Sequence, residues 1–424
     1  MPKKKMSVEG TGIMQLYNSS HGQIYQGDCL EIMKSLPENS IETCITDPPA
    51  GINFMNKKWD SSRGGRDRWI SWMEERFAEV MRILKPGGLA FAWAIPQTAH
   101  WTATAIENVG FKINTKAYFL FGASWPKGAD ISKGIDEHFG CIREKVENPL
   151  KNKQTAGRGS AYPKPGVETI EPEPVHPLAK DWNGWNTQLK PMAEEWVIAM
   201  KPIDKNFANN ALKWGVAGFN IEECRISLNG EEPPTGSKNG NGKIKEGWGF
   251  NRREYITSQK GRYPGNVIIH EEVARDLDEK YGERKSGKMK AGKRSRRKGD
   301  DYGKLSENYN GTETSTGGAS RFFTQCEYFF SGKAPQSEKN IGLGEEKCKH
   351  PTVKNLALMR WLCKLSKTPT GGTIIDPFAG TFSTLIAAYL EGRKFIGIEI
   401  DSEYCRDGLA RLKHAMGMFF EEKE

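Results

Sequence analysis

The fold class is decided by residues 373–401, which read TIIDPFAGTFSTLIAAYLEGRKFIGIEID. The apolar run TIID predicts a buried strand, a turn of small residues follows it, and the next apolar segment has the period of a helix. KFIGIEID predicts a second strand, so Asp376 and Glu399 stand at the carboxyl ends of two strands. Ligands of doubly wound sheets lie at those ends, and an acid about 20 residues beyond the turn suits the paired hydroxyls of a ribose. The turn lacks the G-x-G-x-x-G pattern, and taken alone it is equally well an ordinary strand-to-helix connection.

Strands and helices also alternate through residues 23–121. The segments QIYQGD, SIETCIT, LAFAWAI and FKINTKAYFLF predict strands, and CLEIMKSL, WISWMEERFAEVMRIL and TAHWTATAIENVG predict helices. A further amphipathic helix is predicted at VKNLALMRWLCKLS, shortly before residue 373. This alternation favours an α/β fold built on a doubly wound parallel sheet. Residues 122–318 are instead rich in Gly, Pro, Asn and charge, which is typical of an inserted domain whose loops carry specificity.

The net charge of +9 comes from one segment. Residues 284–298, RKSGKMKAGKRSRRK, hold nine Lys or Arg and no acid, and the rest of the 424-residue chain has no net charge. A basic segment with Gly and Ser and no apolar period predicts a solvated loop that can approach a polyanion. A loop that only keeps the chain soluble is the alternative on these residues alone. Binding to a membrane surface is less favoured, because the segment has no apolar face.

Composition excludes several classes of protein. The chain is 37% hydrophobic with 12 Trp, 19 Phe and 12 Tyr, which excludes a generally disordered chain. No apolar run reaches the length of a transmembrane helix, and no apolar core of a secretory signal follows the basic start. We therefore expect a cytoplasmic protein, or a nuclear one in a host with a nucleus, and no membrane partner. The eight cysteines form no C-x-x-C pair, so we expect reduced thiols and no metal site.

A second polar strand end stands at residues 45–50, ITDPPA. Two prolines fix φ and remove two N–H donors, so the chain leaves the sheet stiffly with its carbonyls exposed. Asp47 and the carbonyl of Pro48 can then converge as two acceptors on an exocyclic amino group of a base. Holding both hydrogens favours a more tetrahedral nitrogen, whose lone pair is free to attack a methyl sulfonium. A plain loop breaker is the alternative for these residues taken alone.

Together these motifs resemble those of the amino-methyltransferases of DNA, which methylate adenine N6 or cytosine N4 with S-adenosylmethionine. The family's D-P-P-aromatic signature corresponds to residues 47–50, its D-P-F-x-G-x-G signature to residues 376–382, and its H-P-T-x-K-P helix to HPTVKNLALMRWL from His350. QGDCLEIMKSLPENSIETCITDPP is also typical of the family. The catalytic motif precedes the cofactor motif, which is the order of the β class. Parts of the middle of the chain resemble members of phage or prophage type more loosely.

The resemblance implies roles for the residues of each motif. The implied catalytic residues are Asp47, Pro48, Pro49 and Ala50. The implied S-adenosylmethionine-binding residues are Asp28, Lys354, Asp376, Pro377, Phe378, Ala379, Gly380, Thr381 and Glu399. Within this set, Asp28 corresponds to the acid that faces the cofactor's adenine, and Glu399 is expected at the ribose. The residues expected at DNA phosphates are Lys288, Lys290, Lys293, Arg294, Arg296 and Arg297.

The resemblance also divides the chain into segments. A tail, residues 1–22, should precede the catalytic half of the methyltransferase domain, residues 23–121. Residues 122–318, which contain the basic loop 284–298, should form an inserted target-recognition region. Residues 319–424 should form the cofactor-binding half.

Two positions differ from the family pattern. Ala50 stands where the family has an aromatic ring that stacks on the extruded base, and Phe54 or Trp59 could supply that ring instead. Phe382 stands where a second glycine is usual, and its ring could crowd the methionine portion of the cofactor. Both differences keep a weakened or inactive relative open as an alternative.

The expected function is site-specific methylation of double-stranded DNA, at adenine N6 because Asp rather than Ser opens the D-P-P motif. Cytosine N4 stays an alternative, as does a catalytically inactive DNA-binding relative. A methyltransferase for small molecules or proteins is third, since the basic loop and the large insertion count against it. A homodimer and a cognate restriction endonuclease are partners that the residues neither require nor exclude.

Overall fold

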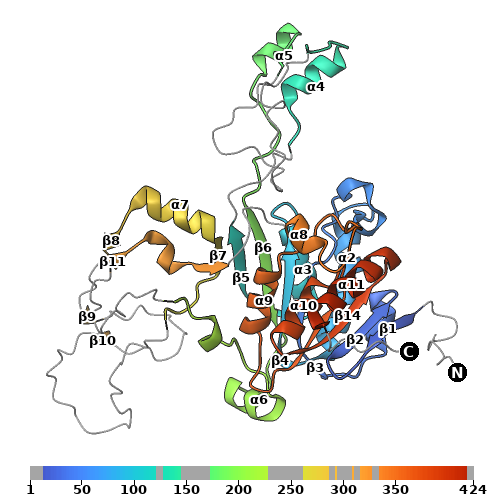
Figure 1. Cartoon of the computed structure of the whole chain (residues 1–424), viewed down its shortest axis with the longest axis vertical. Helices are drawn as coiled ribbons and strands as arrows, with labels where there is room; N and C mark the ends of the chain where they lie inside the picture. Colours follow the sequence, from blue (N-terminus) through green and yellow to red (C-terminus); the bar gives the residue numbers. More distant parts are fainter. Residues whose placement is uncertain are drawn as a thin grey trace.

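The computed structural model describes residues 13–120, 128–144, 172–227, 261–285, 292–293, 308–309, 316–326 and 334–417. They are arranged around one central sheet, with a pair of helices standing away from it at the top of the view in Figure 1. Across these ranges, every helix is too short or too polar to cross a lipid bilayer.

The central sheet has ten strands. In spatial order they are β1 (Met14–Asn18), β2 (Gly22–Gln26), β14 (Lys394–Glu399), β13 (Thr373–Asp376), β3 (Ile41–Thr46), β4 (Leu84–Ala94), β6 (Ala193–Met200), β5 (Lys112–Leu120), β7 (Val267–His270) and β12 (Thr324–Cys326). Of these ten, β1 and β6 run opposite to the others. Two short pairs stand outside the sheet, β8 (Arg284–Lys285) with β11 (Thr316–Gly317) and β9 (Gly292–Lys293) with β10 (Asn308–Tyr309).

Helices cover both faces of the sheet. On one face lie α1 (Cys29–Lys34), α2 (Arg66–Ile83) and α3 (Ala99–Asn108), and on the other α9 (Leu356–Leu365), α10 (Ser383–Leu390) and α11 (Ser402–Met416). Successive strand residues point into the two layers, since Ile374 and Ile45 pack with α9, α10 and α11 while Ile375 and Cys44 pack with α1, α2 and α3. Strands buried on both faces are typical of parallel sheets. The doubly wound α/β class predicted from the sequence is therefore confirmed.

The remaining helices lie outside these two layers. They are α4 (Ile131–His138), α5 (Pro177–Asp181), α6 (Phe207–Trp214), α7 (Glu271–Tyr281) and α8 (Gln336–Lys339), with the 3-10 turns η1 (Phe54–Asn56), η2 (Lys58–Asp60), η3 (Glu222–Cys224) and η4 (Ala319–Phe322). Helix α6 packs at the start of β4, where the side-chain amide of Asn210 donates to the carbonyl of Pro86 over 2.8 Å. Helix α7 packs against β7 and β12 (Figure 1).

One edge of the sheet collects the polar ends of its strands. Five neighbouring strands, β2, β14, β13, β3 and β4, run parallel, so their carboxyl ends meet at that edge. Glu399 and Asp376 end β14 and β13, Asp28 follows β2, and Asp47 follows β3. Because β6 is antiparallel to β4, its first residues, including Glu194, lie at the same edge. This is the edge where ligands of doubly wound sheets bind.

The sheet extends beyond the two halves that the sequence predicts. Strands β6 and β7 lie in residues 122–318, which the sequence assigns to an insertion apart from the sheet, yet β6 pairs with both β4 and β5. Strand β1 lies in the predicted N-terminal tail and pairs with β2, and β12 pairs with β7 rather than with the cofactor-side strands. These boundaries are corrected accordingly. The sequence leaves β6 out of the sheet because EEWVIAM is a short apolar run, whose period does not distinguish a buried strand from a helix.

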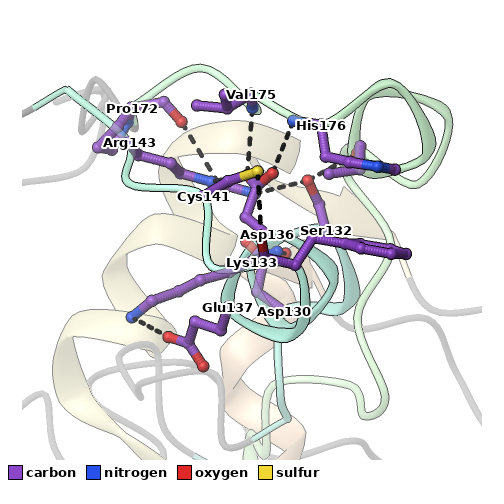
Figure 2. A network of polar contacts seen from close by, with 12 residues as sticks. Asp130, Ser132, Lys133, Asp136, Glu137, Cys141, Arg143, Pro172, Val175 and His176 are labelled. Atoms are coloured by element: carbon purple, nitrogen blue, oxygen red, sulfur yellow. Dashed lines mark hydrogen bonds and ion pairs between the residues drawn. The ribbon is translucent and has the colours of Figure 1, made fainter.

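A buried carboxylate links helices α4 and α5 (Figure 2), beside a direct hydrogen bond from the Ser132 hydroxyl to the carbonyl of Ala179 over 2.7 Å. Asp136 accepts hydrogen bonds from the backbone N–H groups of Val175 and His176 and from Nε of Arg143, the last over 2.7 Å. Arg143 also donates to the hydroxyl of Ser132. Burial alone would raise the pKa of Asp136, but these donors hold it below its usual value. The network therefore joins two segments that lie far apart in the sequence.

We predict that Asp136→Ala loosens this helix pair and leaves the central sheet folded, because three donors lose their acceptor. Hydrogen exchange read by mass spectrometry should become faster in residues 130–143 and 172–181, with unchanged exchange in β13 and β14. Glu137→Ala is the matched control, since Glu137 is exposed and pairs with Lys133 at 3.9 Å. Equal exchange in both variants would show that Asp136 does not hold the pair.

Candidate active site

A cavity of about 1110 Å³ opens at the polar edge of the sheet. Its walls include all of the residues that the sequence assigns to catalysis and to cofactor binding. These are Asp28, Asp47, Pro48, Pro49, Ala50, Lys354, Asp376, Pro377, Phe378, Ala379, Gly380, Thr381 and Glu399. Segments from both ends of the chain therefore meet at one site.

Asp47 forms an ion pair at the end of β3. Its Oδ2 lies 2.9 Å from Nζ of Lys354, whose side chain is 7% exposed. Burial raises the pKa of Asp47 to about 6, and Lys354 partly opposes this rise. The sequence places Lys354 among the cofactor-binding residues, but its contact in the structure is with the predicted catalytic acid.

Asp376 is bound by donors from the protein at both of its oxygens. Oδ1 accepts from the hydroxyl of Thr46 over 2.7 Å and from the N–H of Phe378, and Oδ2 accepts from the hydroxyl of Thr384 over 2.5 Å. Burial raises the pKa of Asp376 to about 6, and the two hydroxyls act against that rise. These bonds join β13 to β3 and to α10, so Asp376 shapes the turn that borders the cavity.

Glu399 holds the same turn from the neighbouring strand. Its Oε2 accepts from the N–H of Gly380 over 2.7 Å, and its Oε1 accepts from the N–H of Asp401 over 2.8 Å. Burial raises the pKa of Glu399 to about 7 despite these donors. Gly380 has φ of +52°, and a Cβ there would lie 3.3 Å from Nε2 of His350. A side chain at this turn would therefore be strained and would narrow the cavity.

Asp28 caps helix α1 beside a cationic and aromatic wall. Its Oδ1 accepts from the N–H of Leu30 over 2.8 Å, and its Oδ2 lies 3.7 Å from a guanidinium nitrogen of Arg76. The guanidinium carbons of Arg76 and Arg63 lie 4.2 and 3.7 Å from the ring centroid of Trp72, which is within cation–π range. Asp28 thus lines the cavity with one oxygen in a helix cap and the other beside a guanidinium.

Phe382 does not border the cavity. It is fully buried and lies in the core with α10 and α11. A Cβ on Gly408 of α11 would come within 2.5 Å of the Phe382 ring, so the glycine makes room for that ring. The expectation that this ring crowds the cofactor is wrong, because the left-handed backbone at Phe382, φ of +67°, turns the side chain into the core.

The loop after the D-P-P motif is organised by a buried acid that belongs to no sequence motif. Asp60 is 1% exposed and accepts from the N–H groups of Gly51 and Phe54, each over 2.8 Å. Ala50, Phe54 and Trp59 all line the cavity. The Trp59 ring is stacked on His350, with centroids 6.0 Å apart.

Two further cavity residues are not predicted from the sequence. Trp93, on β4, lies under Lys354, whose Nζ is 3.4 Å from the ring centroid. Glu194, at the start of β6, has a buried Oε2 without a hydrogen-bond partner in the part of the chain that the structure describes. Neither belongs to a motif, and assigning β6 to the sheet is the step that would have revealed Glu194.

The basic stretch is largely beyond the structural description. Lys293 falls in β9, whereas Lys288, Lys290, Arg294, Arg296 and Arg297 lie outside the described residues.

Within the described ranges, no group of three or more His, Cys, Asp or Glu could hold a metal ion.

Comparisons with known proteins agree with these motifs. A 73-residue stretch is 49% identical to DNA adenine methyltransferase YhdJ of Escherichia coli (strain K12), and 93 residues are 30% identical to type II methyltransferase M.BamHI of Bacillus amyloliquefaciens. These stretches cover 17% and 22% of this chain and only 24% and 21% of those proteins. The solved PvuII DNA methyltransferase (cytosine-N4-specific) aligns with 95% of this chain and 89% of its own, at 14% identity and a TM-score of 0.46. The family model for N6/N4 methyltransferases, described as DNA methylase, matches residues 41–410, and the chain therefore belongs to this DNA methylase family.

Proposed function

We propose that the chain transfers a methyl group from S-adenosylmethionine to adenine N6 in double-stranded DNA. The observation that carries this proposal is the Asp47 carboxylate, partly buried and paired with Lys354, in the same cavity as Glu399. The local similarity to an adenine methyltransferase supports adenine over cytosine N4.

The cavity residues fit S-adenosylmethionine. Glu399 offers a carboxylate to two ribose hydroxyls, and the close backbone at Gly380 leaves room beside it. Asp28 keeps an oxygen for an adenine amino group, with Phe378 and Trp72 near it in the cavity wall. The bound cofactor would supply an activated methyl group on a sulfonium.

Asp47 and Pro48 would act on the target base. A duplex hides the amino group of a base, so methyltransferases rotate the base out of the stack. The Asp47 carboxylate and the Pro48 carbonyl would accept the two amino hydrogens and leave the nitrogen lone pair directed at the methyl donor. As the carbon–nitrogen bond formed, the bond from the methyl carbon to sulfur would break, and its electron pair would stay on the sulfur of S-adenosylhomocysteine. The nitrogen must also lose one proton, which the Asp47 carboxylate would receive. Positioning and preorganised acceptors would carry most of the acceleration.

The first test is nucleoside mass spectrometry of duplex DNA after incubation with the purified chain and S-adenosylmethionine. We expect N6-methyladenine, and we expect Asp47→Ala to lower its rate of formation by about a hundredfold or more, as for loss of one preorganised polar group. Asp67→Ala, which changes an exposed acid on α2, should keep the wild-type rate. N4-methylcytosine instead would move the target to cytosine, and neither product would favour an inactive relative.

The second test concerns the cofactor. Glu399→Ala should weaken S-adenosylmethionine binding by about tenfold to a hundredfold, the range for losing a charged hydrogen bond. Binding should also weaken as pH falls through about 7, because the carboxylate becomes protonated there. Calorimetry measures both the loss of affinity and its pH dependence. Glu399→Gln removes the charge but preserves the turn at Gly380 better than Glu399→Ala does. Glu403→Ala, an exposed acid at the start of α11, is the control. Unchanged affinity in both Glu399 variants would remove this residue from the cofactor site.

Basic residues near the cavity would bind the DNA backbone. Lys57, Lys58 and Arg63 line a second hollow of about 500 Å³, and Lys58 and Arg63 also line the main cavity. The only acid of η2, Asp60, is buried and bound to the loop backbone. We propose that this rim holds phosphates beside the extruded base, together with the basic loop 284–298.

The third test is the salt dependence of DNA binding. Removing one charge that binds a phosphate should reduce the slope of log affinity against log salt by about 0.9, so Lys57→Gln with Lys58→Gln should flatten it by up to about 1.8. Replacing Lys293, Arg294, Arg296 and Arg297 by Gln should also flatten this slope, by a similar amount for DNA of any sequence. Lys213→Gln is the control, because α6 lies at the opposite edge of the sheet. An unchanged slope would reduce the segment concerned to a solubilising role.

A further inference from the structure

We propose that Lys354 is a positioning residue that keeps the Asp47 carboxylate ionised and directs one of its oxygens to the target amino group, and that Glu194 opposes it. This inference rests on the methyl transfer proposed above. It assigns to Lys354 a task other than contact with the cofactor, and it gives a task to Glu194, a residue outside every sequence motif.

The ion pair divides the two oxygens of Asp47. Oδ2 lies 2.9 Å from Nζ of Lys354, so the lysine occupies that oxygen. A carboxylate accepts at both oxygens, so Oδ1 stays available for a hydrogen of the base. A neutral carboxylic acid would instead present a donor and would lose part of its capacity to accept. The reaction therefore needs the Asp47 carboxylate to be ionised and to direct Oδ1 at the target base. The contact with Lys354 would serve both needs.

Lys354 contacts an aromatic ring as well as Asp47. Its Nζ lies 3.4 Å from the centroid of the Trp93 ring, over the electron-rich face. An aromatic face attracts an ammonium at this distance, and the attraction grows when the ammonium is desolvated. The lysine is thus held between an aromatic face and a carboxylate, and its position follows from β4 on one side and β3 on the other.

Two acids oppose this lysine at Asp47, and Asp47 in turn acts on a third acid, Asp376. The nearby charges of Glu194 and Asp60 raise the pKa of Asp47, and Asp376 is close enough for Asp47 to raise its pKa in turn. Asp60 and Asp376 are bound by N–H or hydroxyl donors. Glu194 differs from them, since its Oε2 is buried and has no hydrogen-bond partner among the described residues.

The sign of each effect follows from these contacts. Burial raises the pKa of Asp47 to about 6, and Lys354 lowers it from what burial alone would give. Methyl transfer should fall as pH drops through the pKa of Asp47. Removing Lys354 should move this loss to higher pH, and removing the charge of Glu194 should move it to lower pH. If Lys354 only packed against its neighbours, removing it would leave the pH of this loss unchanged.

The experiment follows the Asp47 carboxyl carbon by NMR in the cofactor-free chain labelled with ¹³C at aspartate Cγ. Asp47→Asn identifies the signal. Lys354→Met should raise the midpoint by about one to three pH units, the usual effect of an opposite charge. Lys354→Arg should stay near wild type, and Glu194→Gln should lower the midpoint. This readout needs no activity, so it tests the inference even if the methyl transfer proposed above fails.

Rates and affinities complete the test. With both substrates saturating, the acid side of the methylation profile should shift with the NMR midpoint in each variant. Calorimetry should find S-adenosylmethionine affinity in Lys354→Met close to that of wild type. An unmoved midpoint in Lys354→Met with lost cofactor affinity would overturn the inference and place the lysine at the cofactor. If Lys354→Met does not fold, Glu194→Gln and Lys354→Arg still test the inference. An unmoved Asp47 titration midpoint in Glu194→Gln would show that the charge of Glu194 does not act against that of Lys354.

Discussion

The site depends on the parallel pairing of β13 between β14 and β3. Residues of β13 pair in register with Gly397 on one side and with Cys44 on the other, although these come from opposite ends of the chain. Parallel register brings the carboxyl ends of the three strands to one edge of the sheet. The Thr46 hydroxyl then binds Asp376 across the β3–β13 boundary. A change in this register would separate the two motifs, whatever residues they contain.

Three carboxylates at this edge, two of them buried and that of Asp47 partly exposed, differ through the donors that bind them. Asp376 is bound by hydroxyls and an N–H group, Glu399 by two N–H groups, and Asp47 by a lysine. Burial raises the pKa of each, to about 6, 7 and 6. Asp376 and Glu399 are thereby bound to the backbone of the turn, whereas Asp47 pairs with a side chain from the other half of the site. Similar side chains at one edge are thus suited to separate tasks.

Much of this arrangement was predictable from the sequence, because it depends on local signals. The strands before Asp47, Asp376 and Glu399 are apolar runs that end in a polar residue, and their shared edge follows from an α/β fold. Contacts across the cavity were not predictable in the same way. The pairing of Lys354 with Asp47 joins residues from opposite ends of the chain, and a motif gives no information on which neighbour a lysine meets. Glu194 was missed because β6 lies among loops of very different composition.

We propose that one cavity holds the cofactor and the target amino group together. A crystal structure of the chain with S-adenosylhomocysteine would show where the cofactor lies. We expect the ribose hydroxyls to lie within hydrogen-bond distance of Glu399 and the sulfur to face Asp47. Density for the ligand away from Glu399, or a sulfur turned from Asp47, would contradict the claim.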